Sequence, residues 1–208
     1  MAAPCPPRAL DTVVFDVGKV LIDWDPRFLY RKLIADAAAM ERFLAEVCTQ
    51  AWNEEQDRGR SFAEAVAELV ARHPAEAALI RAYDERWEEM VPGEIPGSRA
   101  IVEALKARGV RLYALTNFSA EKFALTRRRF PVFSLFEGIL VSGEEGLIKP
   151  DPRIYALIQD RFDIDPSKAL FTDDSPRNIA AAEAVGFHTH LFRDAAGLRQ
   201  TLMQIGLL

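Results

Sequence analysis

Residues 12–16 have the sequence TVVFD, a run of β-branched and aromatic residues that ends in a carboxylate. The apolar character does not alternate along the run, which is typical of a parallel strand buried on both faces. An acidic side chain is unusual at the end of such a strand, because aspartate is rarely buried without a partner. We therefore expect residues 12–16 to form the first core strand, and we take Asp16 as a candidate functional residue.

The chain becomes helical in character after this strand. Asp25, followed by a proline, predicts the start of a helix with Asp25 as its N-cap. No strand-like run occurs from there to about Val91, and Ser61 and Glu64 have the spacing of a capping box. We expect three helices that form a small bundle, near residues 27–47, 61–72 and 75–90.

Helices and strands alternate from residue 98 onward, after a segment rich in proline and glycine. Strands are expected at residues 111–116, 138–141, 169–172 and 188–192. Helices are expected from Ser98 to Arg108, near 120–129, after Asp151, from Ser175 to Gly186, and at the C-terminal end. The alternation predicts an α/β fold with a doubly wound parallel sheet, interrupted after its first strand by the helical bundle. The expected organisation is a core domain of residues 11–22 and 95–208, a cap domain of residues 23–94, and a flexible lead of residues 1–10.

The amino-acid composition favours some classes of protein and argues against others. Half of the 208 residues are hydrophobic, so the chain can bury a sizeable core. The formal net charge of -5 argues against nucleic acid or an anionic membrane as a partner, since such binders normally carry a basic surplus. Cys5 and Cys48 are the only cysteines, which predicts neither a disulfide framework nor a thiolate metal site. The sequence has no signal peptide and no membrane-spanning run, so a cytoplasmic location is expected.

Polar side chains occur where the predicted core strands end. These residues are Asp16, Thr116, Asn117, Lys149, Asp173 and Asp174. One acid at a strand end is as readily explained as a loop cap, but the ends of four parallel strands meet at one edge of a sheet, where ligands bind. Together the side chains offer carboxylates for a hard cation, a hydroxyl and amides for phosphate oxygens, and an ammonium that holds the nucleophile and the transferring group.

Four segments resemble, in order, the four motifs of the haloacid dehalogenase superfamily. They are FDVGKVL at 15–21, LTN at 115–117, KP at 149–150 and FTDDSPRN at 171–178. Each motif is short, but their order, their strand contexts and their spread over the whole core make the resemblance specific. The helical insertion lies between the first and second motifs, which resembles the C1-capped subfamily I of that superfamily.

The resemblance implies a Mg²⁺-dependent phosphatase that acts on a small phosphorylated substrate. Asp16 would attack phosphorus and form an aspartyl-phosphate. Asp174 would bind Mg²⁺ with Asp16 and the backbone carbonyl of Gly18, while Asp173 and Asn178 would bind the metal directly or order its waters. Carboxylates this close would repel one another without a cation, which also favours a metal site.

The same resemblance implies ligands for the phosphoryl group. Thr116 and the amide of Asn117 would hold phosphoryl oxygens, and Lys149 would neutralise the crowded carboxylates and the developing charge. Lys19, in the loop after the first strand, would either reach the phosphate or face solvent.

Position 18 departs from the family pattern. Most phosphatases of the superfamily have a second aspartate two residues after the nucleophile, which acts as general acid and base, whereas this chain has Gly18. A positioned acid contributes about 10²–10⁴-fold, so either another group protonates the leaving oxygen or the leaving group needs less help, as an anomeric sugar oxygen does. The Asp-x-Gly-x-Val pattern at 16–20 resembles a subgroup of sugar-phosphate phosphatases that includes one acting on glucose 1-phosphate.

The segment 52–59 contains candidate substrate contacts. Trp52 and Arg58 are the candidates, because cap residues usually set substrate choice in this superfamily. The alternative interpretation places Trp52 in the core of the bundle, with Asp57 and Arg58 capping helices or forming surface ion pairs. Trp87 is also expected in the bundle core.

Two other functions are weighed against phosphatase activity. A metal-independent 2-haloacid dehalogenase would use Asp16 to displace halide from carbon. The resemblance to such enzymes is weaker, because their fourth motif has Ser and Asn where this chain has Asp173 and Asp174. A degenerate module would bind a phosphorylated ligand or a protein without turnover, but the retained Asp16 and Lys149 argue against a pure binder. A monomer and a homodimer are both compatible with the sequence.

Overall fold

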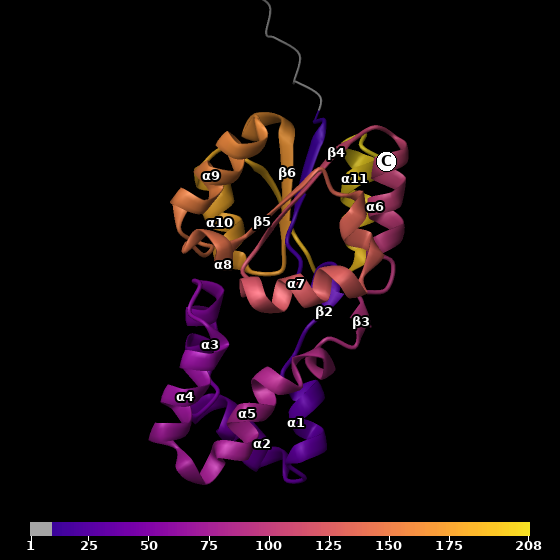
Figure 1. The fold of residues 1–208 in the computed structure, drawn as a ribbon. Coiled ribbons are helices and arrows are strands. Elements are labelled where there is room, and N and C mark those ends of the chain that lie inside the picture. The colour runs from indigo at the N-terminus through magenta and orange to yellow at the C-terminus, as the bar shows by residue number, and fades with distance from the viewer. Residues whose placement is uncertain (1–9) are drawn as a thin grey trace, which may run out of the picture.

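The computed structural model describes residues 10–208, which form two lobes (Figure 1). One lobe contains a five-stranded sheet in the order β5-β4-β1-β6-β7, in which all neighbouring strands are parallel. Its strands are β1 (Thr12–Phe15), β4 (Arg111–Thr116), β5 (Gly138–Val141), β6 (Ala169–Asp173) and β7 (His188–Leu191). The predicted doubly wound α/β fold is confirmed. The predicted lead at 1–10 lies, except for Leu10, outside the described residues.

The central strand β1 marks the point where the strand order reverses. The chain runs from β1 to β4 and β5 on one side, then to β6 and β7 on the other. Crossover connections that diverge in this way leave a crevice beyond the carboxyl ends of the strands, which is where ligands bind in open α/β sheets. Asp16 directly follows β1 and therefore lies at this crevice.

Helices cover both faces of the sheet (Figure 1). One face is covered by α6 (Ser98–Ala107) and α11 (Ala195–Gln204), and the other by α9 (Pro152–Phe162) and α10 (Pro176–Ala184), while α7 (Ala120–Arg129) and α8 (Ser142–Glu145) lie at the carboxyl end of the strands. Val14 belongs to the hydrophobic cluster formed with α9 and α10, whereas Val13 and Phe15 belong to the cluster formed with α6 and α11. Because successive residues of β1 point to opposite covered faces, every residue of the strand is buried, which explains its unbroken apolar run.

The second lobe consists of helices inserted after β1. They are α1 (Arg27–Leu33), α2 (Ala37–Glu46), α3 (Gln50–Asp57), α4 (Phe62–Arg72) and α5 (Ala77–Glu85), with 3₁₀ turns at Pro74–Glu76 and Trp87–Met90. Two short antiparallel strands, β2 (Ile22–Asp23) and β3 (Gly93–Glu94), join this lobe to the sheet. Within residues 10–208, no helix combines the length and the apolar character that crossing a membrane requires.

Local capping decides where these helices begin. The predicted role of Asp25 is confirmed in part: Pro26 is the residue that precedes α1, but Oδ1 of Asp25 accepts a hydrogen bond of 2.8 Å from the backbone N–H of Arg27, the first residue of the helix. The predicted cap at Ser61 is also confirmed, because its hydroxyl accepts a hydrogen bond of 3.2 Å from the backbone N–H of Glu64.

The helical lobe differs from the prediction in three places. The helix expected at 27–47 is two helices, because Asp36 caps a new one by accepting a hydrogen bond from a backbone N–H two residues later. The helix expected at 75–90 is α5 between two 3₁₀ turns. The segment 52–59, expected to lie between helices, belongs mostly to α3, whose N-cap Thr49 accepts a hydrogen bond of 3.0 Å from the backbone three residues later.

Aromatic and charged contacts join the two lobes. The ring of Trp87, from the helical lobe, lies edge-on to the ring of Phe118, which follows β4, with centroids 5.8 Å apart. Lys122 of α7 is buried, forms an ion pair with Asp84 of α5 and donates a hydrogen bond of 3.0 Å to the carbonyl of the same residue. The helical lobe is therefore packed against the carboxyl edge of the sheet.

Candidate active site

The nucleophile candidate Asp16 is fixed at the end of β1 by its own backbone. Its backbone N–H donates a hydrogen bond of 2.8 Å to the carbonyl of Thr172 in β6, which extends the pairing of β1 by one residue. Its Oδ1 atom accepts a hydrogen bond of 2.7 Å from the backbone N–H of Val17. Asp16 is only 8% exposed, so its carboxylate has one open side.

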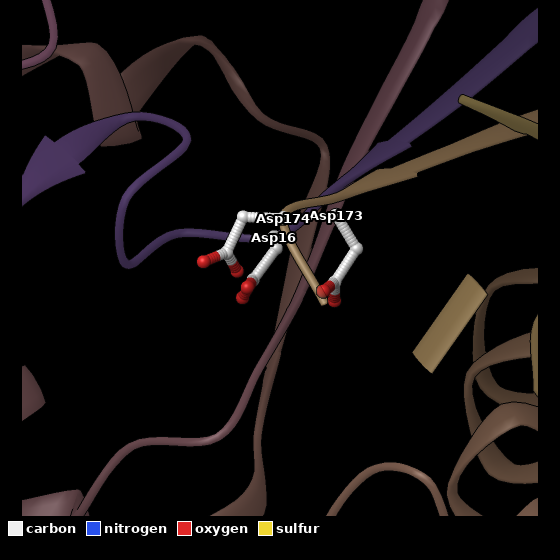
Figure 2. Close-up of side chains that lie close together, drawn as sticks. All are labelled: Asp16, Asp173 and Asp174. Atoms are coloured by element: carbon white, nitrogen blue, oxygen red, sulfur yellow. The ribbon is translucent and has the colours of Figure 1, made fainter. Parts of the chain in front are cut away.

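Three carboxylates meet at this edge of the sheet. Asp16 comes from the end of β1, whereas Asp173 and Asp174 come from the end of β6 (Figure 2). One oxygen from each lies within 4.8 Å of the other two. One buried ammonium, that of Lys149, compensates part of this negative charge. Oxygen ligands with surplus negative charge suit a hard cation such as Mg²⁺, so the donor set fits that metal.

Lys149 occupies the centre of the charge cluster. Its Nζ atom lies 2.8 Å from Oδ1 of Asp16 and 2.7 Å from Oδ2 of Asp173, and it donates a third hydrogen bond of 2.9 Å to the carbonyl of Leu115. Burial alone would lower the pKa of this ammonium, but the charges of the two aspartates outweigh that effect and hold its pKa above the usual value. Lys149 is therefore a permanent cation beside the nucleophile.

The two neighbouring aspartates have different environments. Asp173 is fully buried, and its carboxylate accepts hydrogen bonds from Lys149, from the backbone N–H of Ser175 and from the side-chain amide of Asn178. Asp174 is partly exposed and lines the cavity in front of Asp16. Burial raises the pKa of Asp174, and the charge of Asp173 adds to the effect. Asp174 is thus the more accessible ligand for a cation, while Asp173 holds Lys149 and the start of α10.

The protonation of Asp16 depends on the charges around it. Burial raises its pKa to about 7, Lys149 opposes this rise, and Asp173 and Asp174 add to it. A cation bound to the three carboxylates would lower this pKa, because it favours the ionised form. A bound cation would thus favour the ionised form of Asp16.

Thr116 and Asn117, at the end of β4, have different environments. The Oγ1 atom of Thr116 is buried and has no hydrogen-bond partner within residues 10–208, and Thr116 is not among the residues that line the cavity in front of Asp16. The side chain of Asn117 accepts a hydrogen bond of 2.7 Å from the backbone N–H of Lys149 and donates one of 2.9 Å to its carbonyl. The Asn117 side chain therefore orients the loop that carries Lys149, which leaves its backbone N–H for any contact with a phosphoryl oxygen.

A cavity of about 400 Å³ opens in front of Asp16, between the two lobes. Residues of the core that line it are Asp16, Gly18, Lys19, Asn117, Phe118 and Asp174. Residues from the crossing and the helical lobe are Trp24, Gln50, Asn53, Glu54, Asp57 and Trp87. The site is therefore completed by the inserted helices. Lys19 is exposed and also lines this cavity, so both interpretations of that residue apply.

The two cap residues expected to contact substrate lie elsewhere. Trp52 is only 6% exposed and packs edge-on against Phe62 and Tyr83, so its ring belongs to the core of the helical lobe. Arg58 forms an ion pair of 2.6 Å with Glu55 and lines an adjoining cavity of about 520 Å³ beside Lys149. These positions correct the expectation for Trp52, which does not line either cavity.

The candidate segment 52–59 contains three residues that line the cavity, Asn53, Glu54 and Asp57, but the sequence singled out none of them as a contact, and Gln50 lies outside that segment. Gln50, Asn53, Glu54 and Asp57 lie at positions i, i+3, i+4 and i+7 of α3, which places them on one face of that helix. This polar stripe could have been found if the segment had been taken as helical. Trp87, expected in the bundle core, packs there and also lines the cavity.

Comparison with known proteins places the chain in a family. A family model of haloacid dehalogenase-like hydrolases matches residues 10–186. The chain is 28% identical over 176 residues to a sesquiterpene phosphatase of Aspergillus oryzae, which covers 83% of this chain and 85% of the relative. It is 25% identical over 183 residues to a phosphorylated carbohydrates phosphatase of Thermotoga maritima, which covers 85% of this chain and 82% of the relative.

A solved structure shares the fold. An enzyme of the same family from Bacteroides thetaiotaomicron, in complex with magnesium and inorganic phosphate, has a TM-score of 0.65 and 24% identity, and the match covers 89% of this chain and 96% of that chain. The family model spans all the strand-end residues described above. The chain therefore belongs to the haloacid dehalogenase-like hydrolase family.

Proposed function

We propose that this hydrolase is a Mg²⁺-dependent phosphatase that acts on a small phosphorylated metabolite through an aspartyl-phosphate on Asp16. The observation that carries the proposal is the contact of the Asp16 carboxylate with Lys149, beside Asp173 and Asp174 and open to a cavity. A carboxylate that stays ionised next to a cation site is a suitable nucleophile for phosphorus. The named phosphatases among the relatives support the same reaction class.

The residues of this chain have separate tasks in the reaction. An oxygen of Asp16 attacks phosphorus in line with the leaving oxygen, and Lys149 holds that carboxylate while its charge stabilises the phosphoryl group. The free hydroxyl of Thr116 donates to a phosphoryl oxygen. Asp16, Asp174 and the Gly18 carbonyl would hold Mg²⁺, which would supply positive charge that neutralises the carboxylates and polarises the phosphoryl oxygens.

We propose that residues 23–94 act as a cap domain that encloses the leaving group. The packing of the helical lobe over the carboxyl edge of the sheet supports this division, as does the lining of the cavity by both lobes. Enclosure excludes water from the phosphoryl group during the first displacement. The cap therefore chooses the leaving group, while the core performs the phosphoryl transfer.

The cavity favours a sugar phosphate as substrate. Its volume of about 400 Å³ lies at the small end of the range for ligand pockets. The indole rings of Trp24 and Trp87 line it, and both indole N–H groups are buried without a partner in the described part of the chain. Aromatic faces pack on sugar C–H groups, while indole N–H, Gln50 and Asn53 can bind hydroxyls. The name of the Thermotoga relative supports the same substrate class.

A phosphate-release screen tests this function. Purified protein is incubated with a panel of sugar phosphates, with Mg²⁺ and with EDTA, and Asp16→Asn serves as the matched variant. We expect the wild-type protein to release phosphate from at least one sugar phosphate in Mg²⁺ but not in EDTA, and we expect no release by the variant. Halide release from 2-haloacids in EDTA would favour a dehalogenase instead. Absence of turnover across the panel, combined with tight binding of a phosphorylated ligand, would favour a binding module.

A further inference from the structure

Within residues 10–208, the core supplies no carboxyl at position 18, where a proton donor for the leaving oxygen is expected. A Cβ atom added at Gly18 would meet no atom within 4 Å, so the space beside Asp16 is open. The titratable residues that line the cavity are Asp16, Lys19, Glu54, Asp57 and Asp174. In the proposed reaction Asp16 and Asp174 serve as nucleophile and cation ligand, and Lys19 is exposed to solvent. The two acids of α3 are therefore the candidates for a donor that is held near the leaving oxygen.

Of the two acids, Asp57 has the side chain that is more firmly fixed by its surroundings. It is the last residue of α3, is only 6% exposed and lines the same cavity as Asp16. Its Oδ2 accepts a hydrogen bond of 3.1 Å from the side-chain amide of Asn53, whose own oxygen accepts one of 3.1 Å from the hydroxyl of Tyr83. Glu54 is half-buried and reaches the adjoining cavity as well. The carboxyl of Asp57 is therefore fixed, as a catalytic acid must be.

The core also holds Asp57 in place. The hydroxyl of Ser142, at the start of α8, donates a hydrogen bond of 2.6 Å to the Asp57 carbonyl. The backbone N–H of Ser119, after β4, donates to its carboxylate. The residue thus lies where the helical lobe meets the carboxyl edge of the sheet, with contacts to both sides.

The charges around Asp57 suit proton transfer near neutral pH. Burial raises its pKa to about 7, and the charge of Glu54 adds to this, whereas the N–H of Ser119 and the charge of Arg58 oppose it. Tyr83 faces the same acid, and the pKa of its hydroxyl is raised well above the usual value, so it remains neutral. A carboxyl with such a pKa can give a proton in one step and take one in the next.

We propose that Asp57 is the general acid and base of this enzyme, supplied by the inserted helices in place of the residue missing at Gly18. The inference rests on the proposed phosphatase function. As an oxygen of Asp16 bonds to phosphorus, the bond from phosphorus to the leaving oxygen breaks, and the Asp57 carboxyl gives its proton to that oxygen, which leaves as an alcohol. The ionised Asp57 then takes a proton from water as that water attacks phosphorus, the bond to Asp16 breaks, and phosphate departs.

The competing interpretation is that Asp57 only joins the two lobes. Asp57→Asn separates the two roles, because asparagine keeps the size and can still accept the hydrogen bond from Ser119, but it cannot transfer a proton. The readout is phosphorylation of Asp16 in a single turnover, followed by intact-mass spectrometry. The phosphoryl donors are the best sugar phosphate of the panel, whose alcohol needs a proton, and acetyl phosphate, whose carboxylate leaving group does not.

We expect the two donors to respond differently in the Asp57→Asn variant. Phosphorylation by the sugar phosphate should slow by about 10²–10⁴-fold, while that by acetyl phosphate should change by less than about 5-fold. The phosphorylated protein should then accumulate, because the base that activates water is also lost. Glu46→Gln, an exposed change on α2 of the same lobe, is the matched control and should behave as wild type.

A second variant restores the acid from the other side of the cavity. Gly18→Asp places a carboxyl in the open space beside Asp16, so in combination with Asp57→Asn it should recover at least about 10-fold of the lost sugar-phosphate reaction. Equal slowing with both donors, or no slowing with either, would overturn the role of Asp57. Wild-type protein that transfers no phosphoryl group from any donor would instead overturn the proposed function, and the role of Asp57 with it.

Discussion

The Nζ atom of Lys149 lies 2.8 Å from Oδ1 of Asp16, and the side chains are 0% and 11% exposed, respectively. A buried pair of this kind resists removal of one partner, because the other is left as an uncompensated charge away from water. The contact therefore affects stability as well as nucleophilicity.

Lys149→Met removes the ammonium and keeps most of the aliphatic stem. We expect the free energy of unfolding in EDTA to fall by about 3–5 kcal/mol, since the carboxylates of Asp16 and Asp173 lose their common partner. Phosphate release should be lost as well. Urea unfolding and the phosphate assay measure the two effects. Lys32→Met, which removes an exposed ion pair with Glu89, is the control and should leave the free energy of unfolding and the phosphate release unchanged. An unaltered unfolding midpoint in Lys149→Met would contradict the prediction.

Metal dependence should be visible without any substrate. We expect Mg²⁺ to bind the folded carboxylate cluster and not the unfolded chain, so it should raise the melting temperature of the wild-type protein. Asp174→Asn removes the accessible carboxylate, and we expect its affinity for Mg²⁺ to be lower by about 10–100-fold or more. Titration calorimetry measures the affinities, with the exposed change Asp160→Asn as control. Equal affinities for Mg²⁺ in both variants would exclude Asp174 as a ligand.

Thr116→Val tests the free hydroxyl at the end of β4. The Oγ1 atom is buried without a partner in the described chain, so its removal should leave the melting temperature unchanged or slightly higher. Phosphate release should nevertheless fall by about 10²-fold, because the phosphoryl group loses a fixed donor. Thr126→Val is the control, because the Thr126 hydroxyl donates a hydrogen bond of 2.8 Å to a carbonyl of its own helix and Thr126 does not line the cavity. This variant should keep full activity. A stable Thr116→Val protein with wild-type turnover would remove this hydroxyl from the site.

The core of the fold could be predicted because its signals are local. The strands β1 and β6 are buried over their whole length and consist mainly of apolar and β-branched residues. The carboxyl ends of parallel strands meet at one edge of a sheet, irrespective of the loops that connect them. That rule placed Asp16 and Asp174 together from the sequence alone. The family motifs then gave each of these residues a chemical role.

The inserted helices were harder to predict because their signals are weaker. Asp36 is a normal N-cap residue, but the apolar positions around it continue from one helix into the next and hide the break. The helix that ends at Asp57 is mainly polar, so no apolar stripe marked it, although Trp52 on its other face packs in the lobe. Its position over Asp16 depends on how the two lobes pack, which no local pattern encodes.

The stability of the protein should report the protonation of Asp57 directly. In the unfolded chain this carboxyl ionises near its ordinary pKa of 3.8, whereas burial raises its pKa to about 7 in the folded protein. Its contribution is therefore fully present below pH 3.8 and is lost as the pH rises through about 7. Asp57→Asn has no such loss. Between pH 5 and pH 8, we expect its stability relative to wild type to rise by about 2–3 kcal/mol, measured by urea unfolding at constant Mg²⁺. Glu46→Gln controls for the removal of an exposed acid from the helical lobe and should follow wild type. If the difference in stability between Asp57→Asn and wild type stays constant with pH, Asp57 is already ionised in the folded protein at pH 5.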